Sequence, residues 1–164
     1  MNVTIDLINA CTDTMLPSDQ EFQQWTEAAM AAVSAINGAT LADNTELSIR
    51  LVDETESAFL NENFRQKQGA TNILSFPFDG IKGTDINLLG DIAICAPLVK
   101  KEAADQNKSI ESHWAHLTIH GVLHLYGYDH EKDDAAKKME ALEISILNSL
   151  GFSNPYESNV TDNE

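Results

Sequence analysis

Residues 116–130 read HLTIHGVLHLYGYDH and carry the most specific pattern in the chain. The spacing is H-x-x-x-H-x-x-G-x-x-H, formed by His120, His124, Gly127 and His130. One large class of zinc proteases binds its metal with this spacing and has a glutamate, the general base, directly after the first histidine. Here Gly121 occupies that position. The stretch therefore predicts a protease-like metal-binding helix without the protease's base.

The histidine spacing has a direct geometric meaning. His120 and His124 are four residues apart, so on a helix their rings project from the same face. Gly127 can adopt the left-handed conformation that ends a helix, after which the chain can return to present His130. Three neutral imidazoles suit Zn²⁺ best, with Ni²⁺ or Cu²⁺ as alternatives, and leave a fourth position open as in catalytic zinc sites. Ordinary surface or core histidines are the simpler interpretation, but the glycine and third histidine argue against it.

Three neighbouring side chains are weaker candidates for a role at the metal. His116 lies one turn before the first predicted ligand and is either an ordinary packed histidine or a partner of the site. Asp129 and Glu131 flank the third. For Asp129 we favour a hydrogen bond to a ligand imidazole, or capping of the helix end, over a role as base. A hydrolase does not strictly need the missing glutamate, because zinc lowers the pKa of bound water to about 7.

The rest of the chain predicts one compact domain. Apolar runs predict strands over residues 3–8, 46–52, 73–78 and 88–95. Helices are expected to begin at capping-box patterns or other start signals, at Ser18, Asp53, Pro97, Ser109 and Asp133 or Asp134. Expected helix ends are Gly38 and Gly151, and 79–87 is expected to be a flexible connection. We predict an α/β (α+β) domain over 1–156, with a mixed sheet of about four strands packed against helices. The polar end, SNPYESNVTDNE, is expected to be disordered, with a tail over 157–164.

Composition limits the classes of function. The 164 residues are 43% hydrophobic and have a mean hydropathy of -0.24, which fits a soluble globular protein. No apolar run approaches the roughly 18 residues of a membrane span, so no membrane partner is expected. Two cysteines and a start without a basic and apolar leader favour the cytoplasm. The net charge of -16 repels phosphates at long range, so a nucleic-acid substrate would need local cations.

At this point the residues resemble a known family. HGVLHLYGYDHE, 120–131, is similar to the signature of the YbeY family, bacterial zinc-dependent endoribonucleases of ribosomal RNA maturation. Further segments resemble that family in the same order: NENFRQKQGATNILSFPF (61–78), LLGDIAICAP (88–97), HWAHLTIHG (113–121) and MEALEISILNSLGFSNPY (139–156). The similarity covers about residues 45–156. Asn72 and Ile73 depart from the family's Asp and Val, and neither bears on the metal site.

The resemblance implies specific roles and partners. It implies that zinc is bound by His120, His124 and His130, and that Arg65 is the functional arginine of the cleft. A guanidinium beside a metal can clamp a phosphate in a bidentate way. The implied activity is single-strand-specific endoribonuclease processing of the 3′ end of small-subunit (16S) rRNA, in ribosome maturation and quality control. Implied partners are RNA, the small ribosomal subunit with its proteins, and a ribosome-associated GTPase.

Two other functions stay open from the sequence. A metalloprotease fits the ligand spacing, although Gly121 argues against it. A non-catalytic ribosome-assembly factor with structural zinc fits the charge of -16, because an acidic protein can bind basic ribosomal proteins. Removing a structural zinc should melt the fold, whereas removing a catalytic zinc should largely spare it.

Overall fold

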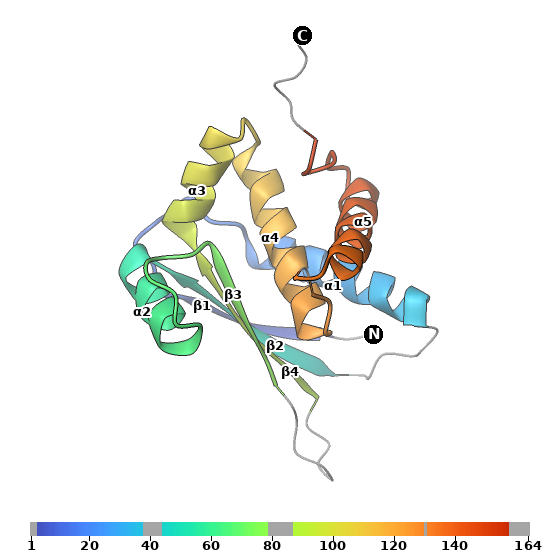
Figure 1. Cartoon of the computed structure of the whole chain (residues 1–164), viewed down its shortest axis with the longest axis horizontal. Coiled ribbons are helices and arrows are strands. Elements are labelled where there is room, and N and C mark those ends of the chain that lie inside the picture. Colours follow the sequence, from blue (N-terminus) through green and yellow to red (C-terminus); the bar gives the residue numbers. More distant parts are fainter. Residues whose placement is uncertain (1–2, 38–43, 79–86, 130, 158–164) are drawn as a thin grey trace.

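The computed structural model describes residues 3–37, 44–78, 87–129 and 131–157. These residues form a single α+β domain with a four-stranded mixed sheet (Figure 1). The strands are β1 (Val3–Asn9), β2 (Thr45–Val52), β3 (Ile73–Pro77) and β4 (Leu88–Cys95). Their order is β1-β2-β4-β3, in which β1, β2 and β4 are parallel and edge strand β3 is antiparallel to β4. The predicted fold class is confirmed.

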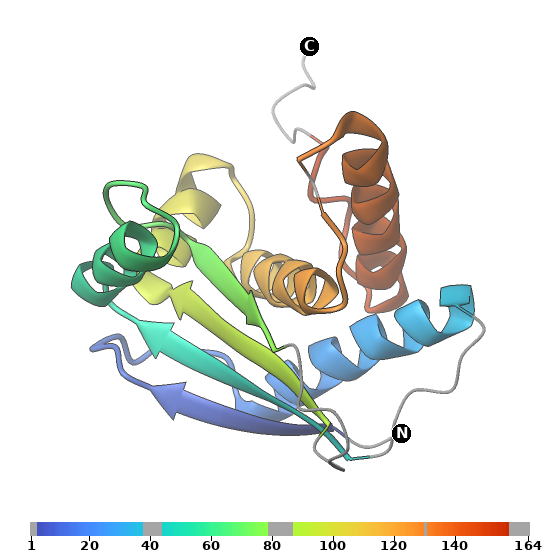
Figure 2. The same cartoon turned by 60° about the horizontal axis from the view of Figure 1, so that its bottom comes forward.

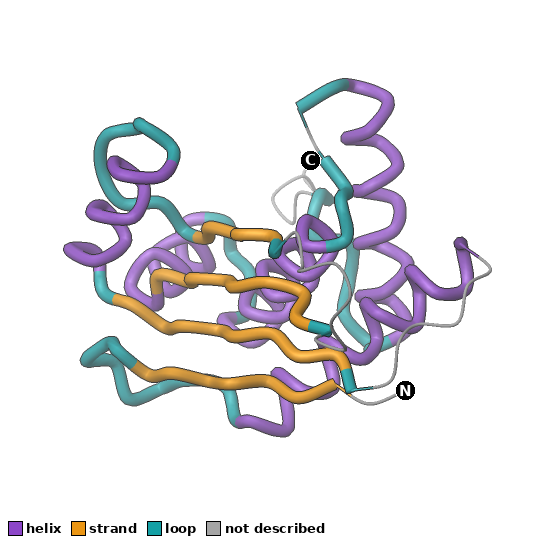
Figure 3. Tube along the Cα trace, turned by 90° about the horizontal axis from the view of Figure 1, so that it is seen from below, coloured by secondary structure: helices purple, strands orange, loops and turns teal. Residues whose placement is uncertain are grey.

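Five helices belong to the described part of the chain. They are α1 (Asp19–Asn37), α2 (Glu54–Phe64), α3 (Ala96–Asp105), α4 (Ile110–Leu125) and α5 (Asp133–Ser149). Helices α1 and α4 lie on one face of the sheet, and α5 packs on the outer side of α4 (Figure 2). Seen from below, the strands lie in front of α4, and α5 stands beside the sheet (Figure 3). None of the described helices is long and apolar enough to cross a membrane.

Two of the predicted helix starts are confirmed in atomic detail. The Ser18 hydroxyl accepts the Glu21 N–H at 3.1 Å, and Glu21 accepts the Ser18 N–H at 2.9 Å, which completes a capping box. Ser109 caps α4 by accepting the Ser112 N–H at 3.1 Å. Local sequence alone is sufficient at these two positions, because every partner lies within three residues.

The capping box predicted at Asp53 is wrong, although α2 does begin at the next residue. The two Asp53 carboxylate oxygens each accept the Thr12 backbone N–H at 3.2 Å instead of a helix N–H. Glu56 pairs with Arg50 Nε on β2 at 2.6 Å. Partners brought in by the tertiary fold replace the local ones, which no local pattern can anticipate. The predicted helix end at Gly38 lies outside the described residues, as does the expected flexible connection except for Asn87.

Helix α4 runs through the centre of the domain. Most of its side chains are buried, and Leu117, Ile119, Val122 and Leu123 join the main core. It contacts β3 and β4 on one side and α1, α3 and α5 on the others. A helix enclosed in this way has little freedom to move, so it is a rigid base for the histidines that it carries.

The chain end is more ordered than its composition suggests. Gly151 ends α5 with a φ of 92° as predicted, and Phe152 N–H then donates to Leu147 O at 2.9 Å. The following residues pack back on the domain, where Lys108 Nζ donates to Pro155 O at 2.6 Å. The expected disorder is therefore wrong for residues 153–156. Residues 158–164 of the predicted tail lie outside the described chain.

Candidate active site

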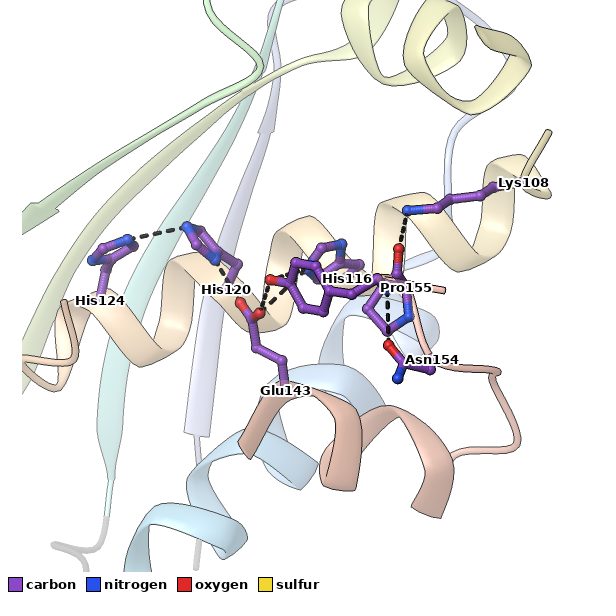
Figure 4. Close-up of polar contacts among 8 residues, drawn as sticks. Lys108, His116, His120, His124, Glu143, Asn154 and Pro155 are labelled. Carbon is purple, nitrogen blue, oxygen red and sulfur yellow. Dashed lines mark hydrogen bonds and ion pairs between the residues drawn. The ribbon is translucent and has the colours of Figure 1, made fainter. Parts of the chain in front are cut away.

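The last two turns of α4 bring two histidine nitrogens together. His120 Nε2 and His124 Nε2 are 3.0 Å apart, and Figure 4 shows the two rings directed toward one another. Two imidazoles bound to one zinc ion at about 2.0–2.1 Å in a tetrahedron would have their nitrogens roughly 3.3 Å apart. The observed separation is close to that value. The pair thus fits a shared metal ion by both donor type and position.

The glycine of the spacing pattern performs the predicted turn. Gly127 has a φ of 96°, its N–H donates to His124 O at 2.9 Å, and Tyr128 N–H donates to Leu123 O at 3.1 Å. These are the two bonds of a Schellman motif. No neighbouring atom lies within 4 Å of where a Gly127 Cβ would stand, so the backbone angle alone requires glycine. His130, the third predicted ligand, lies outside the described residues, and its role stays a prediction.

A buried carboxylate on α5 holds the other nitrogen of His120. Glu143 has no exposed surface, and its Oε2 lies 2.5 Å from His120 Nδ1. A carboxylate accepts hydrogen bonds, so Nδ1 carries the proton and donates. Nε2 is then the unprotonated nitrogen, which is the tautomer that a metal ligand needs. For Asp129 we expected either such a hydrogen bond to a ligand imidazole or capping of the helix end. Its Oδ1 accepts the Glu131 N–H at 3.0 Å and thus caps the turn that follows α4.

Glu143 stays ionised because hydrogen bonds stabilise its carboxylate. Its Oε1 accepts a hydrogen bond from the Tyr156 hydroxyl and lies 3.4 Å from His116 Nε2. Burial alone would raise the pKa of Glu143, but the hydrogen bonds from His116 and His120 outweigh burial and lower that pKa to about 2. A buried charge without such partners would cost several kcal/mol. The sequence does hold a signal for this residue, since Glu143 lies among the apolar residues Met139, Leu142 and Ile146 on the buried face of α5.

His116, His120 and Glu143 also form a group that could hold a metal ion, with one donor atom from each within 4.8 Å of the others. The distance between His120 Nδ1 and Glu143 Oε2 argues for a different arrangement. At 2.5 Å these atoms are closer than two ligands of one zinc ion, which lie about 3 Å or more apart. The contact is therefore a hydrogen bond, which leaves the Nε2 atom of His120, 3.0 Å from His124 Nε2, available to an ion.

A cleft of about 840 Å³ runs past these histidines and is also lined by Arg65, Lys67 and Ser75. Arg65 follows the last residue of α2, and its N–H is fixed by Asn61 O at 3.0 Å. Within the described residues, no acidic group pairs with the Arg65 side chain. Its guanidinium is thus available to an anion in the cleft that also holds the histidine pair.

The packing around Gly121 explains why the protease glutamate is missing from this helix. A Cβ at this position would lie 2.8 Å from Ile73 Cδ1 and 3.1 Å from Ile92 Cδ1. The position faces the sheet and not the cleft, because α4 packs closely against β3 and β4 at this point. A glutamate here would have to enter the core, so the packing of this fold excludes the protease arrangement.

Known proteins identify the family to which these features belong. Residues 8–151 match the family described as Endoribonuclease YbeY. The protein named Endoribonuclease YbeY of Colwellia psychrerythraea (strain 34H / ATCC BAA-681) is 51% identical over 152 residues, covering 93% of this chain and 96% of the relative. The chain belongs to the YbeY endoribonuclease family. It is thus an endoribonuclease, and the metalloprotease alternative is wrong.

A solved structure supports the fold of this YbeY endoribonuclease. The solution structure of TM1509 from Thermotoga maritima aligns with a TM-score of 0.56 at 24% identity, covering 98% of this chain and 100% of the other. At that identity the likeness concerns the fold alone. An RNA substrate follows from the family, and within the described residues the cleft along α4 brings together the paired Nε2 atoms of His120 and His124 and an arginine without an acidic partner.

Proposed function

We propose that this endoribonuclease cleaves single-stranded RNA with a zinc ion bound by His120, His124 and His130, and with Arg65 as its phosphate-binding residue. The observation that carries the proposal is the 3.0 Å approach of two histidine Nε2 atoms in the cleft that Arg65 lines. When bound, zinc would polarise a phosphoryl oxygen or lower the pKa of a water molecule to about 7. Ni²⁺ and Cu²⁺ are the alternative ions for these ligands.

The residues of the chain have distinct tasks in this proposal. Glu143 accepts the Nδ1 proton of His120 and keeps Nε2 free for the metal. Arg65 presents a planar guanidinium that binds two phosphate oxygens at once and stabilises the charge that builds up during cleavage. Lys67 lines the same part of the cleft and adds a second positive charge.

The charge distribution makes an RNA substrate compatible with so acidic a chain. The chain has only ten Lys and Arg residues, and three of them, Arg65, Lys67 and Lys108, line this one cleft. At physiological ionic strength, charges further than about 8 Å away are largely screened. A phosphate in the cleft therefore interacts mainly with the charges that line it, which are these three cations and the carboxylates of Glu102, Asp129 and Glu131. The remaining acidic surface restricts the RNA to the cleft, which favours a flexible single strand over a rigid duplex.

The biological role is the second part of the proposal. We assign to the enzyme the processing of the 3′ end of 16S rRNA, within ribosome maturation and quality control in the cytoplasm. An acidic protein is suited to basic small-subunit proteins, and a ribosome-associated GTPase is a further proposed partner. The family resemblance and the charge of -16 support this role. The same charge favours an additional, non-catalytic contribution to subunit assembly.

RNA cleavage by protein of measured zinc content tests the proposed chemistry. Wild type and Lys101→Ala, an exposed lysine paired with Asp105, should cleave a labelled single strand and spare the same strand in a duplex. Arg65→Lys should cleave more slowly, because lysine cannot bind a phosphate bidentately. Arg65→Ala should be slower by about 100-fold or more, because it loses the positive charge altogether. His124→Ala should be inactive. Equal cleavage by wild type and His124→Ala would contradict the proposal.

A further inference from the structure

A short C-terminal turn is fixed beside the metal-binding helix. Asn154 Oδ1 accepts the Tyr156 N–H at 2.8 Å, which shapes the turn. Lys108, in the connection between α3 and α4, holds it through the bond from Nζ to Pro155 O at 2.6 Å, drawn in Figure 4. The turn is thus attached to the domain by a contact that does not involve the Tyr156 side chain.

The Tyr156 side chain joins this turn to the buried carboxylate. Tyr156 is 45% exposed as a whole, whereas Glu143 is fully buried. The Tyr156 hydroxyl nevertheless donates to Glu143 Oε1. The ring stands edge-on to His116, with centroids 5.3 Å apart and planes at 82°. Burial, followed by the contact with ionised Glu143, raises the pKa of Tyr156, so the hydroxyl stays protonated and donates.

The two oxygens of Glu143 transmit this contact to the metal site. Oε1 is held by the Tyr156 hydroxyl, and Oε2 accepts the proton of His120 Nδ1 at 2.5 Å. Because both oxygens belong to one rigid carboxylate, fixing one of them fixes the direction of the other. Without the hydroxyl, the partner left for Oε1 among the described contacts is His116 Nε2 at 3.4 Å, a long and weak bond.

We propose that Tyr156 is a positioning residue of the metal centre, which raises metal affinity by holding Glu143 and, through it, the His120 ring in the ligand orientation. The inference rests on the proposed metal site at His120 and His124. It assigns a role to the extreme C-terminal end of the described chain, a segment that carries no ligand of its own.

The expected effects differ in size along this chain of contacts. Replacing a residue that directly orients a ligand histidine typically lowers metal affinity by 10–100-fold. Glu143→Gln should fall in that range, because an amide has a single acceptor oxygen and cannot accept hydrogen bonds from both His120 Nδ1 and the Tyr156 hydroxyl. Tyr156→Phe acts one step further away, so roughly 3- to 10-fold weaker binding is expected. The fold should be kept, since the bond from Lys108 and the packing of Phe152 remain.

Zinc titration against a chromophoric chelator, with thermal unfolding of the metal-free proteins, tests the proposal. Tyr126→Phe is the matched control, because that variant also loses the hydroxyl of a half-buried tyrosine, and no described contact joins this hydroxyl to Glu143. We expect weaker zinc binding by Tyr156→Phe alone of the two. The metal-free Tyr156→Phe protein should stay folded and melt at a somewhat lower temperature, because the buried Glu143 carboxylate loses a hydrogen-bond donor. Wild-type affinity in Tyr156→Phe would overturn the inference, and so would a loss equal to that of Tyr126→Phe.

Two further variants separate this inference from the proposed function. His124→Ala should lose zinc binding, and if it binds zinc like wild type, the metal site itself is wrong. If His124→Ala loses zinc while Tyr156→Phe does not, the site stands and only the positioning role fails. Glu143→Gln is measured as well, because it removes the contact between Glu143 and His120 directly. If Glu143→Gln binds zinc as tightly as wild type does, the inference is also overturned.

Discussion

His120 uses both of its ring nitrogens, and this gives the residue a central place in the site. Nδ1 donates to Glu143 at 2.5 Å, and Nε2 lies 3.0 Å from the Nε2 of His124. One imidazole therefore links a buried carboxylate of α5 to the cleft. Changes in the core of α5 are expected to reach the metal through this single ring.

Gly121 gives a prediction about packing at the same scale. Gly121→Glu should lower the free energy of unfolding by about 3 kcal/mol or more, because it overpacks the contact with Ile73 and Ile92 and buries a charge. Gly121→Ala is the control and should change stability little. Its helix propensity is better by roughly 1 kcal/mol, which offsets the close contact with the isoleucine side chains. Urea unfolding measures both. A Gly121→Glu protein as stable as wild type would show that the position is open.

Glu143 gives a prediction about pH. Its folded pKa of about 2 lies below the ordinary value of 4.5, so its ionised form stabilises the fold above pH 4.5 and this contribution is lost as pH falls toward 2. The metal-free wild type should therefore be more stable than Glu143→Gln by about 3 kcal/mol at pH 6, with a smaller difference at pH 3.5. Urea unfolding at the two pH values measures this difference. A difference that does not shrink on acidification would contradict the assigned hydrogen bonds.

At the scale of the element, α4 and its terminal turn set the position of the ligands. The Gly127 conformation is required by φ and not by space, so Gly127→Ala should cost roughly 1–2 kcal/mol of stability. It should also weaken zinc binding, because the chain leaves α4 here on its way to His130. Gly69→Ala is the matched control, since Gly69 has a φ of 89° and no neighbour within 4 Å. Equal zinc affinities of the two variants would count against this role of the turn.

The element scale also separates what the sequence could predict from what it could not. The approach of His120 and His124 on α4 and the turn at Gly127 depend on contacts within four or five residues, so their spacing was sufficient to predict them. Glu143 was missed because it reaches His120 across 23 residues, through the packing of α5 on α4. Tyr156 was missed for a related reason. Its polar terminal segment predicts disorder, and only the fold shows that its partner is the buried Glu143. An acidic residue on the apolar face of α5 was the available signal.

On the scale of the whole molecule, an acidic protein has to bind RNA through few cations. Lys108 Nζ is bonded to Pro155 O, so Arg65 and Lys67 are the cleft cations whose side chains have no hydrogen bond or ion pair among the described contacts. Two phosphate contacts predict a slope of log K against log salt of about -1.4 for a single strand. Fluorescence anisotropy with cleavage-inactive His124→Ala, over roughly 50 to 200 mM salt, measures it. A slope steeper than about -4 would mean that the RNA contacts a much larger basic surface.

The most direct test of the central claim compares two histidines on the same helix. Zinc content and RNA cleavage are measured together for His116→Ala and His124→Ala. The site built on the Nε2 atoms of His120 and His124 predicts that His124→Ala loses both zinc and cleavage. His116→Ala should keep a full equivalent of zinc and its activity. Loss of zinc in His116→Ala with retention in His124→Ala would instead place the ion among His116, His120 and Glu143, and would contradict the account.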